Sequence, residues 1–195
     1  KFLGETKSNK PDQLALRANL LANTGRSDEA AKTFEDQLGK NPNDKTALLN
    51  AVSTYQAAGN DAKANALLED GYKRGLLTDP KELRALYVGY MNAERYADAQ
   101  KVIDEGIAKG IIKDGPDLAK DYMILAQNAY FTGSDSEAIA LYKKAAPVGK
   151  AGEAYLNLAK LLRDQGKTAE AKAAAQQALD KGVAKPAEAK EILSN

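Results

Sequence analysis

Apolar residues recur along most of the chain at steps of three and four, which is the spacing of one buried stripe on an α-helix. The first two stripes consist of Leu14, Ala18 and Leu21, and of Ala30, Phe34 and Leu38. The sequence has no convincing alternation of apolar and polar residues, which would indicate a strand. The pattern therefore predicts pairs of amphipathic helices and an all-α fold.

These helical pairs repeat with a nearly constant period. An alanine near the start of each second helix recurs at spacings of 34, 35, 39 and 33 residues, as Ala30, Ala64, Ala99, Ala138 and Ala171. Five residues before each alanine stands a turn residue, namely Gly25, Gly59, Glu94, Gly133 and Gly166. Glycine suits the end of a helix because it adopts a left-handed backbone conformation at little cost. Ser134 and Thr168, just after two of these turns, are predicted to cap the next helix.

The period divides the chain into five repeats of two helices each. Their approximate bounds are 11–44, 45–79, 80–116, 117–150 and 151–184. Residues 185–195 start with Pro186 near a helix start and carry an apolar face, so they are expected to form a capping helix over the last repeat. Residues 1–10 are interpreted as the tail of a preceding repeat, which would make the chain part of a longer protein, or as a disordered end.

A unit of this length with these landmarks resembles the tetratricopeptide repeat. The landmark positions of that family are filled in the first unit by Leu14, Ala18, Leu21, Gly25, Ala30, Phe34 and Pro42. The resemblance covers residues 11–183 and implies a right-handed superhelical solenoid whose first helices line a concave face. The early tryptophan of the family is missing from every unit, and later units lack the proline. A resemblance to the related SEL-like repeat, at residues 141–146, ranks second.

The composition argues against most enzyme chemistry. The 195 residues include no Cys and no His, which removes thiol nucleophiles, thiolate metal sites and the usual general base at neutral pH. The 28 Lys and Arg residues nearly balance 27 Asp and Glu, and a net charge of +1 argues against nonspecific nucleic-acid binding. No run approaches the ~20 apolar residues of a membrane span. We expect a protein that is not an enzyme and requires neither metal nor cofactor.

Three patterns that could carry chemistry have simpler interpretations. Gly166-Lys167-Thr168 resembles the end of a phosphate-binding loop but lacks the earlier glycine and the preceding strand, so a turn and a helix start are expected. The acidic pairs Glu69/Asp70 and Asp135/Glu137 are interpreted as solvated helix faces.

Most of the nine tyrosines fall on the apolar stripes and are expected in the core, with hydroxyls at its rim. These are Tyr55, Tyr87, Tyr90, Tyr122, Tyr142 and Tyr155. Tyr130 and Phe131 stand together at the end of a first helix, and at least one of them is expected to leave the buried stripe. Tyr130 is therefore a candidate for stacking on a ligand or for a contact between repeats.

Residues off the apolar stripes of the first helices are predicted to line a peptide-binding groove. The candidates are Asn19, Asn23, Asn50, Ser53, Gln56, Lys81, Arg84, Lys120, Gln127, Tyr130, Lys160 and Arg163, and Asp12, Met91 and Glu153 complete the set. With five basic and two acidic side chains, the set is mildly basic on a nearly neutral chain. A basic face favours a protein or peptide partner that is acidic or presents a free C-terminal carboxylate, and the alternative is a solvated face.

One tetratricopeptide-repeat subfamily holds the C-terminal carboxylate of a peptide in a clamp of Lys, Asn and Arg side chains. By resemblance, Asn19, Asn50 and Lys81 match three places of that clamp. Ala15 and Ala85 stand where two of its cations would be, so a clamp here would lack much of its charge-assisted hydrogen bonding.

Two functions are consistent with this sequence. The first is a non-catalytic scaffold that recruits a protein or peptide through its groove, as part of a larger bacterial protein or assembly. The alternative is a structural subunit that self-associates. The Cys-free, Ala- and Lys-rich composition resembles exported repeat proteins of Gram-negative bacteria, which suggests a periplasmic or exported location, with the bacterial cytoplasm as the alternative.

Overall fold

The computed structural model of the chain describes Leu21 and residues 24–194, and within them the secondary structure is ten α-helices without a β-strand. The predicted all-α fold is confirmed. The chain divides into two units between Ile112 and Lys113, inside the longest spacing of the repeat. The lengths of the helices, nine to 16 residues, are those expected for helical hairpins stacked on one another.

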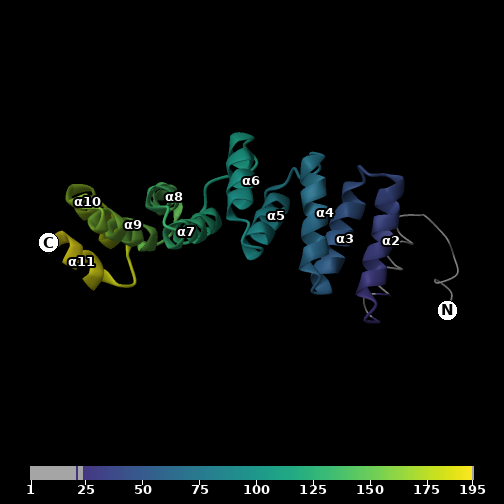
Figure 1. The fold of residues 1–195 in the computed structure, drawn as a ribbon, viewed down its shortest axis with the longest axis horizontal. Coiled ribbons are helices and arrows are strands. Elements are labelled where there is room, and N and C mark those ends of the chain that lie inside the picture. Colours follow the sequence, from purple (N-terminus) through teal and green to yellow (C-terminus); the bar gives the residue numbers. More distant parts are fainter. Residues whose placement is uncertain (1–20, 22–23, 195) are drawn as a thin grey trace. The chain divides into compact units, whose positions relative to one another are not determined.

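The first unit contains five helices in the described residues. They are α2 (Ser27–Lys40), α3 (Lys45–Ala57), α4 (Asp61–Lys73), α5 (Pro80–Asn92) and α6 (Tyr96–Ala108). Each helix packs on the next one along the chain (Figure 1). The second unit contains α7 (Pro116–Phe131), α8 (Asp135–Val148), α9 (Glu153–Asp164), α10 (Thr168–Lys181) and α11 (Pro186–Ser194).

In the second unit, α11 packs against both α9 and α10. Its apolar face buries Ala189 and Ile192, while Lys160 of α9 forms an ion pair with Glu188. A helix forms where the sequence predicted one. The division of the whole chain into five repeats stays a prediction, because the first helix of the first repeat lies mostly outside the described residues.

Alanines hold the two helices of each hairpin close together. Each alanine that marks the repeat is at most 1% exposed, namely Ala30, Ala64, Ala99, Ala138 and Ala171. Around them the core is built from leucines and tyrosines. The prediction of core tyrosines is confirmed for Tyr55, Tyr87, Tyr90, Tyr122 and Tyr142, which are buried, whereas Tyr155 is half-buried.

The five turns within the hairpins share one backbone geometry. The residue after each turn position donates its N–H to a carbonyl five residues earlier, as Arg26 does to Leu21 at 2.8 Å and Ser134 to Ala129 at 2.7 Å. The turn residue itself has a left-handed backbone, with φ from 72° to 80° at the four glycines and 57° at Glu94. Among the described residues Glu94 is the only non-glycine with positive φ, so the turns lie where the spacing predicted them.

Helices α4 and α6 end in turns of the same geometry, with Gly75 and Gly110 as the left-handed turn residues. Leu76 N donates to Gly71 O at 2.9 Å, and Ile111 N donates to Gly106 O at 2.9 Å. In each helix the next apolar residue then folds back against the glycine: a Cβ at Gly106 would lie 2.5 Å from Ile112 Cδ1. The exits Gly-Leu-Leu and Gly-Ile-Ile thus bury Leu77 and Ile112 between helices.

Candidate functional site

The predicted groove is best described unit by unit. Asn19 and Asn23, with Asp12 and Ala15, lie outside the described residues. In the first unit α3 presents Ser53 and Gln56 to solvent, with Asn50 half-buried beside them. On α5, Lys81 is exposed in the first turn and Arg84 is half-buried one turn later. Polar side chains therefore lie on the outward faces of both first helices, as the apolar spacing predicted.

One residue of the predicted set faces inward instead. Met91 on α5 is 7% exposed and belongs to the core, so its assignment to the groove was wrong. Met91 follows Tyr90 directly, and the last turn of α5 buries both side chains together with Gly89. Because the first helix is covered from more than one side at this end, its buried stripe is wider than a step of three or four predicts.

In the second unit α7 presents Lys120, Gln127 and Tyr130, all exposed, and α9 presents Lys160 and Arg163. The two cations on α9 already have acidic partners. Lys160 pairs with Glu188 of the last helix, and Arg163 Nη2 lies 3.2 Å from Asp164 Oδ1. Glu188 in turn has a pKa below its usual range because Lys160 and Lys185 donate hydrogen bonds to it.

These pairs weaken the basic character that the sequence predicted for the groove. Arg84 is also engaged within the chain. Lys81 and Lys120 are the groove cations without an ion pair to another described residue, one in each unit. The sequence could not show this, since the partner of Lys160 lies 28 positions away in another helix.

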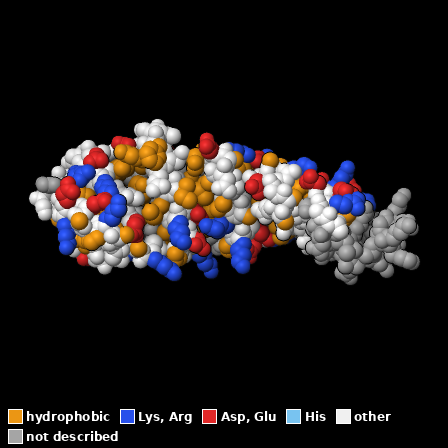
Figure 2. Space-filling view, turned by 90° about the horizontal axis from the view of Figure 1, so that it is seen from below, with side chains coloured by type: hydrophobic (Ala, Val, Ile, Leu, Met, Phe, Trp, Pro, Cys, Tyr) orange, Lys and Arg blue, Asp and Glu red, His pale blue; other side chains and the backbone are white. Residues whose placement is uncertain are grey.

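The outward face of α7 differs from those of the other described first helices because it is partly apolar. Ile124 is 45% exposed, Tyr130 44% and Phe131 83%. The Tyr130 and Phe131 ring centroids lie 5.6 Å apart at an interplanar angle of 57°. On the face that the space-filling view draws, hydrophobic side chains lie among Lys, Arg, Asp and Glu side chains (Figure 2). The prediction that at least one of Tyr130 and Phe131 leaves the buried stripe is confirmed, since both are exposed, whereas Ile124 was missed.

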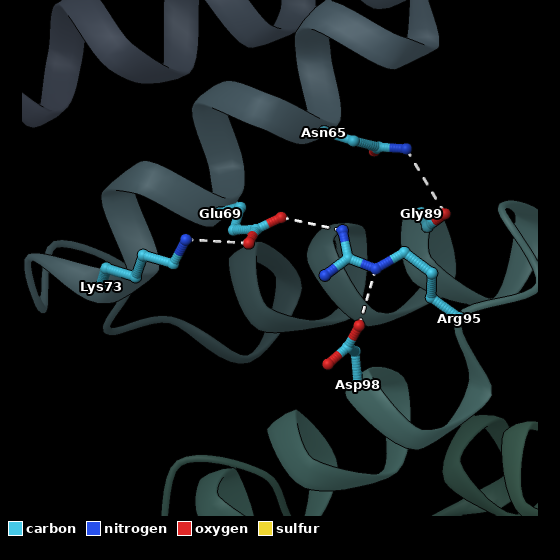
Figure 3. Close-up of polar contacts among 6 residues, drawn as sticks. All are labelled: Asn65, Glu69, Lys73, Gly89, Arg95 and Asp98. Carbon is cyan, nitrogen blue, oxygen red and sulfur yellow. Dashed lines mark hydrogen bonds and ion pairs between the residues drawn. The ribbon is translucent and has the colours of Figure 1, made fainter.

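A polar cluster joins α4 to the start of α6 (Figure 3). Arg95 Nη1 lies 2.9 Å from Glu69 Oε2, and its Nε lies 2.6 Å from Asp98 Oδ2. Lys73 Nζ approaches Glu69 Oε1 to 2.9 Å, and the Arg95 guanidinium stacks on the Tyr90 ring at 4.3 Å. The hydrogen bonds from Arg95 and Lys73 lower the pKa of Glu69 to about 2.

This cluster corrects the interpretation of Glu69 as part of a solvated helix face. Its carboxylate binds Arg95 and so connects α4, in one hairpin of the first unit, to the start of α6 in the next hairpin. Beside it Asn65 covers Gly89, where a Cβ would meet Asn65 Oδ1 at 2.2 Å, and Asn65 Nδ2 lies 3.4 Å from Gly89 O. The arrangement fixes one helix against another.

Two surface pockets lie beside second helices, where the sequence gave no signal. One of about 410 Å³ lies between α2 and α4 and is lined by Glu35, Leu38, Pro42, Leu67, Asp70 and Arg74. The other, of about 300 Å³, lies between α8 and α10 with Leu158 and Leu162 of α9 beneath it. Lys143 and Glu170 pair at 3.4 Å in its lining. Such pockets form between helices that are distant in sequence, so periodicity does not predict them.

Other ligand chemistry finds little support in the described residues. They contain no group of three or more His, Cys, Asp or Glu side chains arranged to hold a metal ion. None of their helices is long and apolar enough to cross a membrane. Gly166-Lys167-Thr168 forms a turn and the start of α10, as predicted. The predicted capping by Ser134 and Thr168 was wrong, because Ser134 makes no side-chain cap bond and α10 starts at Thr168 after Lys167.

Comparisons with known proteins agree with this architecture. The tetratricopeptide repeat family model matches residues 156–195. The crystal structure of MamA is 21% identical over 84% of this chain and 93% of its own, with a TM-score of 0.57. The structure of YrrB, described as a TPR protein with an unusual peptide-binding site, is 14% identical over 94% and 91% of the two chains, with a TM-score of 0.58.

A further MamA structure, from Desulfovibrio magneticus RS-1, is 14% identical over 90% of this chain and 95% of its own, with a TM-score of 0.56. A search of curated protein sequences gave no match. At these identities the solved structures share the fold with this chain.

Proposed function

We propose that this tetratricopeptide-repeat chain is a non-catalytic scaffold that binds an extended segment of a partner protein along the outward faces of its first helices. Proteins of this fold are generally interaction scaffolds, and the solved structure of YrrB is described as having a peptide-binding site. The absence of Cys and His from the sequence supports a function without catalysis.

The proposal rests on two neighbouring polar side chains on α3, Ser53 and Gln56, which make no hydrogen bond within the described residues. Both side chains are exposed. Hydroxyl and amide groups can both donate and accept, so they can pair with the N–H and C=O groups of an extended peptide. A side chain that already forms an ion pair within the chain, as Lys160 does with Glu188, is less available to bind a peptide.

Lys81 gives this surface a preference for an acidic residue in the bound segment. It is exposed in the first turn of α5, the end of that helix that contacts the start of α3 through Lys45 and Glu82, and it has no ion pair in the described residues of its unit. A complete carboxylate clamp is not expected, since Ala85 supplies no cation and Arg84 is engaged elsewhere. An ion pair at an exposed lysine contributes roughly 0.2–1 kcal/mol, which corresponds to a preference of up to about fivefold.

A direct test measures fluorescence anisotropy with a labelled ten-residue peptide rich in Asp and Glu and with its Asn and Gln counterpart. We expect the acidic peptide to bind about two- to fivefold more tightly and to lose that advantage in Lys81→Glu. Lys101→Glu, an exposed charge reversal on α6, is the matched control and should retain it. The proposal fails if both peptides bind equally to the unaltered chain, or if both reversals weaken binding alike at equal melting temperatures.

Self-association is the second candidate, and the exposure of Ile124 and Phe131 favours it because large apolar side chains in solvent often mark contact surfaces. Light scattering across a hundredfold range of concentration separates the two, because a scaffold should keep a constant mass and a self-associating subunit should not. A periplasmic or exported bacterial location stays a prediction, which fractionation of the source cells would test.

A further inference from the structure

Tyrosine rings in this protein are frequently covered by a cation from the same chain. Five of them carry one, at distances from 4.3 to 5.7 Å between the cation and the ring centroid: Tyr55, Tyr72, Tyr90, Tyr122 and Tyr155. Within the described residues no Lys or Arg stacks on Tyr130 or Phe131, although these two rings are the most exposed aromatic pair. Their free faces are therefore available to a cation from outside the chain.

The turn between α5 and α6 shows how a guanidinium fills such a position. Arg95 directly follows the turn residue Glu94. Its guanidinium stacks on the ring of Tyr90, near the end of α5, and donates a hydrogen bond to the carboxylate of Asp98, in the first turn of α6. The Arg95 side chain thus makes a cation–π contact and an ion pair at the tip of the same hairpin. The planar guanidinium suits this task because it stacks on a ring and donates in its own plane.

The turn before α2 has the same arrangement of charges. Arg26 follows Gly25 and donates to Glu29, with Nε 2.7 Å from Glu29 Oε1. Arg26 and Arg95 both stand at the N-cap of their helix, and the turns that precede them share the same backbone hydrogen bond. Their side chains therefore start from equivalent backbone positions, and each reaches the acidic residue three positions further on.

The turn between α7 and α8 keeps the backbone and the acid but lacks the arginine. Ser134 stands at the N-cap of α8 and Glu137 lies three residues later, whereas the position of Tyr90 is taken by the buried Ala129. The exposed rings of Tyr130 and Phe131 follow Ala129 and end α7. Glu137 is exposed and has no ion pair to a described residue. Asp135 adds a second carboxylate, which Gln165 Nε2 approaches to 3.5 Å. Exposed rings and an acid are present at this tip, and the arginine that stands at the N-cap of α2 and of α6 is missing.

We propose that the tip of the α7–α8 hairpin, formed by Tyr130, Phe131 and Glu137, binds an arginine side chain presented by a partner protein. The partner's guanidinium pairs with Glu137, at the position that Asp98 has for Arg95, and stacks on the exposed ring of Tyr130 or Phe131, which stand one and two residues after the position of Tyr90. Charge complementarity favours this occupant, since the tip carries two carboxylates and Ser134 is neutral. The contact is separate from the first-helix surface of the proposed function and requires the opposite charge in the partner.

A peptide containing three arginines in nine residues provides the probe, and the same peptide with neutral citrulline in place of arginine provides its control. Chemical-shift titration of the full chain should show saturable binding of the arginine peptide, with the largest changes at Phe131 and Glu137. We expect affinity to fall at least fivefold with citrulline, in Phe131→Ala and in Glu137→Gln. Glu29→Gln, at a tip whose acid already has an arginine, should leave it unchanged.

Ser134→Arg offers an independent test because it supplies the missing guanidinium from within the chain. By analogy with Arg95 it should pair with Glu137, retain the fold and lower the affinity for the arginine peptide at least fivefold, whereas Ser134→Gln should not. Unsaturated binding up to millimolar peptide, equal binding of the citrulline peptide, or shifts that map away from this tip would overturn the proposal. A concentration-dependent mass that disappears in Phe131→Ala would assign the tip to a second copy and also overturn it.

Lys81→Glu separates this proposal from the proposed function. It should abolish the preference for an acidic peptide and leave the arginine peptide unaffected, so that either interaction can fail while the other stands.

Discussion

At the scale of single residues, Glu94 holds a left-handed backbone conformation with φ 57°, which the other four hairpin turns assign to glycine. A residue with a Cβ pays about 1–2 kcal/mol for this conformation, while glycine loses more entropy on folding. We expect Glu94→Gly to raise the free energy of unfolding by about 0.5–1 kcal/mol in urea denaturation. Glu94→Ala, which removes the charge but keeps the Cβ, should not raise the free energy of unfolding. An increase equal to that of Glu94→Gly would contradict backbone strain as the cause.

Residue positions set by the local chain were predictable from sequence, and those set by distant partners were not. The turn at Glu94 followed from its spacing to Ala99, because both lie in one hairpin. The pairing of Glu69 with Arg95 spans 26 positions and two helices, so the sequence suggested only a solvated carboxylate. The same limit hid the neutralisation of Lys160 and thereby overstated the charge of the groove.

At the scale of helices, the cluster around Glu69 makes the packing of α4 on the next hairpin dependent on pH. The folded pKa of Glu69, about 2, lies below its ordinary value of 4.5 because Arg95 and Lys73 stabilise the charged form. Its contribution is therefore present above about pH 4.5 and is lost as the pH falls towards 2. We expect Glu69→Gln to melt below the unaltered protein at pH 7 and at nearly the same temperature near pH 2, as measured by circular dichroism.

Glu105 and Glu188 also have lowered pKa values, so both proteins should lose stability in acid. The informative quantity is the difference between their melting temperatures. A difference that stays constant from pH 7 to pH 2 would show that Glu69 contributes through packing alone and would contradict the electrostatic origin.

Helix existence and pairing were predictable because apolar periodicity and turn glycines act within about 35 residues. The sealing of α4 and α6 by Leu77 and Ile112 was only partly visible: the Gly-Leu-Leu and Gly-Ile-Ile exits stood out, while Gly71 and Gly106 did not. Their role depends on side chains from another helix, since a Cβ at Gly71 would lie 2.4 Å from Leu48 Cδ2. Close approaches of this kind follow from tertiary packing.

At the scale of the whole molecule, the repeat fold is shared with proteins that are only 14–21% identical to it. Within this chain the repeats have buried alanines and turns in common, which many sequences can supply, while the residues on their outward faces differ. The fold could therefore be predicted from sequence, whereas the partner must be sought on those faces. Its two candidate contacts differ in charge, with Lys81 on α5 and Glu137 on α8.

The central claim, that the outward faces of the first helices receive a partner protein, is tested most directly by site-specific photo-crosslinking. A benzophenone amino acid is placed at Ser53 or Gln56 on the first helix α3 and, as matched controls, at Ala66 on α4 or Lys101 on α6, which are exposed on second helices of the same unit. In extract of the source cells we predict that one partner is crosslinked from both first-helix positions and from neither control. Capture from the second-helix positions alone, or equally from all four, would contradict the claim.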